Sequence, residues 1–291
     1  MSGMKLPSVS LLSSIVLASL VLTFADQASA TIIVSDNFNA LDNPVTGVRN
    51  ANGQYSAGAD ASVWWFENTN GLSTSALSTP TATGNFSGNW IQINFANGGG
   101  PNNMAVSPFA GVSLLNVGDS ISVQFDYRYV ANPGTTDMSP KFGLFNGTAP
   151  TSDQAGLTSV VSGYSANSIN GATDSVALAK ATGAFFVGGD TSLGLANVGS
   201  VFDGTFTMNY KFELVRTGAA AMTVRIYLND VLALTSIDSS ATNFTFNEFA
   251  IRARGTAQID NFVVVAVPEP ATISAFALGL GVLAIACRRR K

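Results

Sequence analysis

The sequence contains no histidine and one cysteine, Cys287. Without histidine, a Ser-His-Asp triad, a Cys-His pair and histidine-based transition-metal sites are excluded. Because Cys287 has no second cysteine in the chain to pair with, no internal disulfide can hold the fold together. Stability must come from a packed core, and carboxylates are the main catalytic groups that remain.

Charged residues are also scarce, at 11% of the chain against 46% hydrophobic residues. Between residues 31 and 267 we count 9 Lys and Arg against 16 Asp and Glu, so this part carries a net charge of 9 − 16 = −7. An acidic surface without a basic cluster argues against nucleic acid as a partner. The abundant small residues are typical of short strands joined by turns.

The N-terminal 30 residues have the pattern of a signal peptide. Lys5 supplies a positive start, residues 11–24 form an apolar run, and Ala28-Ser29-Ala30 is a small-x-small cleavage site. We therefore predict that residues 1–30 are removed on export. The alternative, a buried core helix, fits poorly because the run begins so close to Met1.

The C-terminus combines a proline-rich motif, an apolar run over residues 271–287 and a basic tail. The two prolines remove backbone donors and fix φ, so no helix can continue through them. As a helix the apolar run would span about 25 Å, somewhat less than a hydrocarbon core of about 30 Å. The residues that carry this pattern are Val267, Pro268, Glu269 and Pro270, followed by Arg288, Arg289, Arg290 and Lys291.

Residues 267–291 resemble the PEP-CTERM sorting signal of Gram-negative bacteria, which has these parts in the same order. The resemblance implies recognition by an exosortase, a membrane transpeptidase-like enzyme, together with the secretion machinery. It also implies transient anchoring in the inner membrane, cleavage near Pro-Glu-Pro, and delivery to the cell surface or extracellular matrix. An ordinary single-pass anchor is the alternative.

Residues 31–266 are predicted to form one all-β domain. Apolar and polar residues alternate over 121–129, 208–214 and 223–228, which is the strand period, and Asn229-Asp230 suits a tight hairpin turn. Residues 148–180 lack clear periodicity and are expected to form a loop. Shorter strands are expected at 32–34, 90–95, 142–145, 184–187, 231–234, 249–253 and 259–267.

Three segments of this domain, residues 35–38, 210–229 and 259–265, resemble strands of concanavalin A-like jelly rolls. The resemblance implies an antiparallel β-sandwich. That fold hosts lectins, glycosidases, lyases and scaffolds, so it does not by itself decide the function.

An enzyme acting on glycosides needs two carboxylates about 5 to 9.5 Å apart. Glu67, Glu213 and Glu248 lie far apart in the sequence, and the Glu-x-Asp-x-x-Glu motif of laminarinase-like enzymes is missing. We therefore predict a protein without catalytic residues.

Carbohydrate binding would use aromatic rings flanked by polar groups. The candidates are Trp64, Trp65, Trp90, Asp126 and Arg128. The alternative is that these aromatic residues belong to the core.

No cofactor is predicted, except that calcium could bind between Asp36 and Asp260, which open two Asp-Asn-Phe triplets near the first and last strands. The alternative is that each aspartate opens a turn.

The leading prediction is a non-enzymatic surface or matrix protein that binds polysaccharide or is structural in an exopolysaccharide layer. The rivals are a polysaccharide hydrolase or lyase, and an adhesin or self-assembling scaffold. Paired acids on one face would favour the enzyme, and long exposed sheet edges would favour the scaffold.

Overall fold

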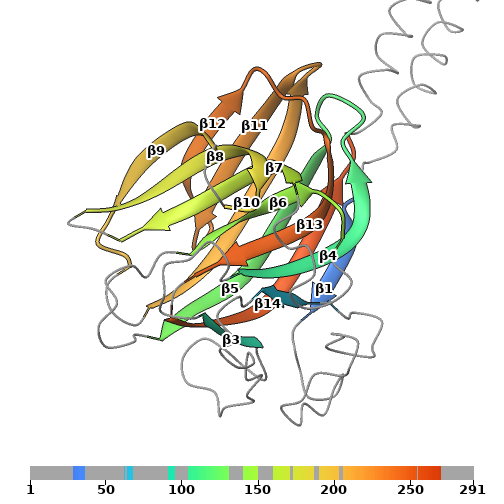
Figure 1. Cartoon of the computed structure of the whole chain (residues 1–291). Coiled ribbons are helices and arrows are strands. Elements are labelled where there is room, and N and C mark those ends of the chain that lie inside the picture. The colour runs from blue at the N-terminus through green and yellow to red at the C-terminus, as the bar shows by residue number, and fades with distance from the viewer. Residues whose placement is uncertain are drawn as a thin grey trace, which may run out of the picture. The chain divides into compact units, whose positions relative to one another are not determined.

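The computed structural model describes residues 29–36, 62, 64–67, 91–95, 104–130, 140–149, 160–170, 173–186, 190–202, 206–253 and 255–269. All regular elements in these ranges are β-strands, and they form two antiparallel sheets (Figure 1). The predicted antiparallel β-sandwich is therefore confirmed. Residues Thr31–Val267 form one compact unit.

The first sheet contains the first and last strands of the chain. Its strands run in the order β1, β14, β5, β10, β11, β12, and β3 also pairs with β14. Their bounds are β1 (Thr31–Asp36), β3 (Ile91–Phe95), β5 (Ser120–Val130), β10 (Phe206–Gly218), β11 (Ala221–Leu228), β12 (Val231–Asp238) and β14 (Gly255–Val267).

The second sheet runs in the order β2, β4, β13, β6, β7, β8, β9. Its strands are β2 (Trp65–Glu67), β4 (Met104–Ser113), β6 (Lys141–Asn146), β7 (Val160–Ile169), β8 (Asp174–Ala184), β9 (Thr191–Gly199) and β13 (Thr245–Arg252). The strands β12 and β9 are the last strands of their sheets, and they lie next to each other on one side of the sandwich (Figure 1).

The alternating segments form the centre of the first sheet. In β5 and β10 every second side chain is buried, so each strand has one face toward the core and one face away from it. The hairpin between β11 and β12 turns at Asn229 and Asp230, whose φ angles are 49° and 65°. Positive φ at both positions is the geometry of a type I′ turn, so the predicted hairpin is confirmed.

The expected loop over residues 148–180 is wrong, because this range contains β7 and the first part of β8. The outward residues of β7 include Gly163, Ser165 and Asn167, and those of β8 include Ala177, Ala179 and Ala181, so neither strand shows a clear apolar–polar alternation. The strand expected at 184–187 is also misplaced. Ala184 ends β8, and Phe185 and Phe186 form a turn in which Phe186 has a φ of 55°.

Aromatic side chains from both sheets fill the core. Phe142 of the second sheet meets Tyr210 and Phe125 of the first sheet edge to face, with ring centroids 4.9 and 5.1 Å apart. Each such contact contributes about 0.5–1.5 kcal/mol beyond the area that it buries. With no disulfide, these contacts join the two sheets.

The final strand β14 lies between β1 and β5 and is antiparallel to both. Thr31, the first residue of β1, is the cross-strand neighbour of Ala266, near the end of β14. The strand continues through Val267, where the sequence analysis began the sorting segment. The mature chain is predicted to start at Thr31 in β1, and the sorting motif is predicted to start at Val267 in β14. These two strand ends are paired with each other.

Candidate functional site

Trp64, the first tryptophan proposed to stack on a sugar, is fully buried in the core. Its ring meets Phe262 and Phe249 at centroid distances of 5.2 and 6.0 Å, and its Nε1 donates to Ser62 Oγ at 2.7 Å. No ligand can reach this ring in the folded protein. Trp65 begins β2, and Trp90 lies outside the described residues.

Asp36 is bound to the segment that carries Trp64. Its Oδ2 accepts hydrogen bonds from the backbone N of Ser62 at 3.0 Å and from the Ser62 Oγ at 2.7 Å. The carboxylate at the end of β1 is therefore hydrogen-bonded to Ser62, two residues before the buried Trp64.

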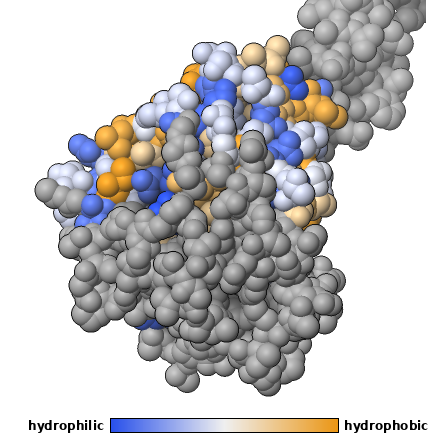
Figure 2. All heavy atoms as spheres, viewed as in Figure 1, coloured by the Kyte–Doolittle hydropathy of each residue, from blue (hydrophilic) through white to orange (hydrophobic). Residues whose placement is uncertain are grey.

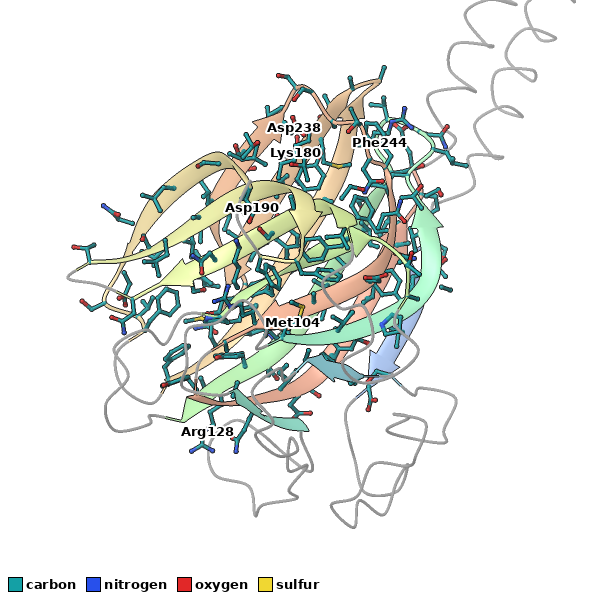
Figure 3. The ribbon with its side chains drawn as sticks, in the orientation of Figure 1. Met104, Arg128, Lys180, Asp190, Asp238 and Phe244 are labelled. Atoms are coloured by element: carbon teal, nitrogen blue, oxygen red, sulfur yellow. The ribbon has the colours of Figure 1, made fainter. Side chains whose placement is uncertain are left out.

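Asp126 and Asp260 are cross-strand neighbours on β5 and β14. Asp126 accepts hydrogen bonds from Asn209 Nδ2 at 2.7 Å and from Asn261 Nδ2 at 2.8 Å. These amides hold both of its oxygens in place, on the face of the first sheet that points away from the core. Arg128 lies on the same face two residues further along β5, at the end of the sandwich far from Asp238 (Figure 3).

Asp260 is fully buried. Its Oδ1 accepts the backbone N–H of Asn261 at 2.7 Å, while its Oδ2 has no hydrogen-bond partner among the described residues. Its pKa is raised to about 7, mainly by burial and also by the charges of Asp126 and Asp36, while the hydrogen bond from Asn261 acts to lower it.

The charge of Asp36 is close enough to Asp260 to contribute to its raised pKa. A metal site needs a group of at least three acidic, histidine or cysteine side chains, and the described residues contain no such group. Calcium binding at this pair stays a prediction.

A shallow hollow of about 150 Å³ lies on the second sheet, on the face away from the core. Two rows of paired residues cross β6, β7, β8 and β9 there. One of the rows holds only small residues, and the other ends in the longer side chains of Lys141 and Leu195. One row is Lys141, Asn167, Ala177 and Leu195, and the other is Gly143, Ser165, Ala179 and Ser192.

Gly143 lies at the β6 end of the second row, and this position must be glycine. A Cβ atom at this position would lie 2.2 Å from the carbonyl oxygen of Tyr164 and 2.9 Å from the ring of Phe145. Only glycine permits this close approach of β6 and β7. Beside it, the hydroxyl of Ser165 is buried and has no hydrogen-bond partner among the described residues.

Two opposite charges border the hollow. Lys141 Nζ lies 2.5 Å from Asp190 Oδ2, and the two side chains are 22% and 14% exposed. The Lys141 ammonium also lies 5.4 Å from the centroid of the Phe186 ring, a cation–π arrangement. Asp190, labelled in Figure 3, comes directly before β9.

The sequence analysis did not identify this hollow. Its residues come from β6 to β9, and two of those strands lay inside the expected loop. The alternation of Tyr164 with Ser165 and of Leu178 with Ala179 was the available signal, but serine and alanine occur on either side of a strand.

Glu248 of β13 is a second buried acid that the sequence analysis did not recognise as unusual. It is fully buried, and neither of its oxygens has a hydrogen-bond partner among the described residues. Burial raises its pKa to about 7, so near neutral pH it exchanges between the protonated and the ionised form.

The chain is similar in structure to several solved proteins at very low sequence identity. One is a legume lectin-like domain from Entamoeba histolytica, with 8% identity and a TM-score of 0.37 over 60% of this chain and 82% of that domain. Another is the alginate lyase Aly36B, with 12% identity and a TM-score of 0.40 over 81% of this chain and 96% of the lyase.

A third is the CBM2 module of an evolved Dit protein from Lactobacillus casei BL23 phage J-1, with 8% identity and a TM-score of 0.45 over 84% of this chain and 98% of the module. All three scores lie below 0.5, so we base the function on the side chains of this chain alone. No curated protein matches the sequence.

Within the part that the structure describes, no helix is both long and apolar enough to cross a membrane. Of the predicted sorting residues, Val267, Pro268 and Glu269 are described, and Pro270 and the basic tail lie outside the described residues. Residues 266–291 match the PEP-CTERM protein-sorting motif. The chain therefore carries a PEP-CTERM sorting signal, which marks it as an exported protein.

Proposed function

We propose that this exported protein is processed by an exosortase and delivered to the cell surface or to an exopolysaccharide matrix. There its β-sandwich binds carbohydrate without catalysing a reaction. The match of residues 266–291 to the sorting motif supports the export route. The hollow on the second sheet supports the binding role.

The observation that carries the binding role is the composition of the hollow. Its lining combines hydroxyl and amide groups with small apolar side chains, among them Ser165, Asn167, Ser192, Ala177 and Ala179. Sugars present hydroxyl groups at their edges and C–H groups on their faces, and a lining of this kind can meet both.

The acids of the described residues argue against a glycosidase. Among the described residues that line the hollow, Asp190 is the one carboxylate, whereas glycoside hydrolysis uses two. Asp126 and Asp260 are neighbours and differ in environment, as an acid–base pair would. However, Asp260 is 0% exposed and cannot reach a glycosidic oxygen in this structure.

The test is a panel of matrix polysaccharides and shorter glycans. The full-length chain, purified in a detergent without a sugar headgroup, is assayed for retention and for release of reducing or unsaturated ends in the same samples. We expect retention without product. Product release would instead establish the rival hydrolase or lyase.

The variant Asn167→Ala should lower retention, because it removes an amide from the lining of the hollow. Its matched control is Ser122→Ala on the outer face of the first sheet, which should retain ligand like the unchanged protein. If Asn167→Ala folds normally and retains every glycan as well as the control does, the hollow is not the binding site.

A structural scaffold is the second candidate. The observation that favours it is the edge strand β12, which has three exposed large hydrophobic residues: Val231, Leu232 and Ile237. The scaffold would be favoured over the binding protein if the whole panel gave neither retention nor product and the protein assembled as its concentration rose.

A further inference from the structure

Among the described residues that line the hollow on the second sheet, the charges cancel. Lys141 and Asp190 are the two charged residues of this set, and their ammonium and carboxylate groups are 2.5 Å apart. At that distance the pair forms a charge-assisted hydrogen bond, and a ligand meets a neutral surface.

A second cation, Arg252, lies beside Lys141 on the neighbouring strand and makes its contact elsewhere. Arg252 is the cross-strand neighbour of Lys141, but it does not line the hollow. Its Nη1 donates to the carbonyl oxygen of Phe186 at 3.3 Å. The Lys141 ammonium in turn has the Phe186 ring and Asp190 as partners, so neither cation is free to receive a ligand carboxylate.

The size of the hollow limits the ligand to one ring. Its volume of about 150 Å³ is well below the roughly 300–1,000 Å³ of a pocket that encloses a drug-sized ligand. A single sugar ring in a longer chain, with its neighbours in solvent, fits a site of this size. Leu195, 62% exposed and paired with Ala177 across β9 and β8, adds an apolar rim for the C–H face of the ring.

We propose that the hollow selects an uncharged sugar ring over a uronic acid, and that Asp190 is the residue that determines this specificity. The inference rests on the proposed carbohydrate binding. A uronate carboxylate at Lys141 would have to displace Asp190, which breaks the ion pair, or lie beside Asp190, which places two like charges together. A neutral ring leaves the Lys141–Asp190 pair intact and accepts hydrogen bonds from the groups around it.

The experiment compares two ligand series on the full-length chain in a detergent without a sugar headgroup. One series is the methyl glycosides of glucose, galactose and mannose, and the other is the corresponding uronates. Dissociation constants are measured at low and high salt by ligand-observed NMR. The unchanged protein should bind at least one neutral glycoside about tenfold or more tighter than its uronate.

The variant Asp190→Asn should reverse this preference. It frees the Lys141 ammonium while keeping a side chain of the same shape, so uronate affinity should rise by about tenfold and fall again at high salt. Asp230→Asn is the matched control. Asp230 is exposed in the β11–β12 hairpin at a φ that asparagine tolerates, so this variant changes the net charge equally without touching the hollow.

The outcomes separate the two proposals. If the unchanged protein binds uronates as tightly as neutral rings, or if Asp190→Asn behaves like Asp230→Asn, the specificity inference is wrong and carbohydrate binding stands. If neither series binds and the polysaccharide panel is not retained either, the proposed function itself is wrong.

Discussion

Lys180 and Asp238 form an ion pair that joins the two sheets, with Lys180 Nζ 2.9 Å from Asp238 Oδ2 (Figure 3). Lys180 belongs to β8 of the second sheet, and Asp238 ends β12 of the first. Asp238 also accepts hydrogen bonds from Tyr164 Oη at 2.8 Å and from Ser240 N and Oγ at 2.9 Å. Burial raises the pKa of Asp238, but these donors outweigh it and hold the pKa below its usual value.

Replacing this aspartate should weaken the contact between the sheets. Asp238→Asn leaves the Lys180 ammonium, 15% exposed, without its carboxylate, so the free energy of unfolding should fall by about 3 kcal/mol. Urea denaturation measures the change, with Asp230→Asn as a control that should change it little. Equal stability of the two variants would show that the pair contributes nothing.

The same carboxylate should make the protein lose stability in acid. Its folded pKa lies below its unfolded value of 3.8, so its contribution is complete above that pH and disappears as the pH falls through the folded pKa. Asp238→Asn should therefore show a smaller loss between pH 4 and pH 2 than the unchanged protein.

Glu248 should have the opposite effect at higher pH. Its folded pKa of about 7 exceeds the ordinary value of 4.5, so between these values the folded protein holds a proton that the unfolded chain has lost. The contribution of Glu248 to stability is therefore complete below about pH 4.5 and falls as the pH rises to 7, by at most about 1.4 kcal/mol per pH unit. Asp260 has a similarly raised pKa and should add to the slope.

The variant Glu248→Gln tests this relationship. It keeps the shape of the side chain without an ionisable group, so the unfolding free energy should decline less steeply between pH 5 and pH 7. Unfolding is followed by urea titration at each pH. An unchanged slope would mean that Glu248 is ionised in the folded protein throughout this range.

Trp64 should matter for stability and not for ligand contact. Trp64→Ala should lower the free energy of unfolding by about 3–5 kcal/mol, because it empties a site packed against Phe249 and Phe262. Trp64→Phe should be milder and should retain glycans like the unchanged protein. If the Trp64→Phe variant folds normally but no longer retains glycans, Trp64 is part of the binding site after all.

The exposed side of the sandwich at β9 and β12 should promote association. Leu232 and Ile237 of β12 and Leu195 of β9 are exposed, and hydrophobic residues gather on the side where β9 lies (Figure 2). The one charged residue of β12, Asp238, is buried in its ion pair. An edge without exposed charge lacks the usual protection against pairing with other chains.

We expect Ile237→Lys to raise the concentration at which light scattering begins, with little change in the unfolding midpoint. Leu115→Lys is the control, since Leu115 is 73% exposed but lies in the segment after β4 and not on a sheet edge. If both variants improve solubility equally, overall charge and not the edge is responsible.

Strong alternation made most of the fold predictable. Phe125, Tyr127 and Phe212 occur at a clear period of two, and Asn229-Asp230 is a strong hairpin signal, so the strands around them were correctly predicted. In β7 and β8, alanine, serine and glycine occupy both faces, so the period disappears. The predictable strands were those whose outward residues are charged or large and polar.

The candidate site was less predictable because it depends on contacts between distant strands. Lys141 and Asp190 are 49 positions apart, and their pairing depends on the turn that follows β8. The approach of Asp36 to Asp260 likewise depends on the pairing of β1 with β14, which the sequence analysis could state only as a condition. The sequence could not show whether Trp64 is buried or exposed, because tryptophan is found both in cores and on surfaces.

The position of β14 has a mechanical consequence. The sorting segment follows directly after Val267, so a pull on that segment acts along β14 from its C-terminal end. The hydrogen bonds to β1 and β5 lie across this direction on both sides, so they share the load and must fail together. Had the last strand been at the edge of the sheet and pulled sideways, its bonds would open one at a time. A tether at this end would therefore load the sandwich in shear, the direction in which a sheet resists force best.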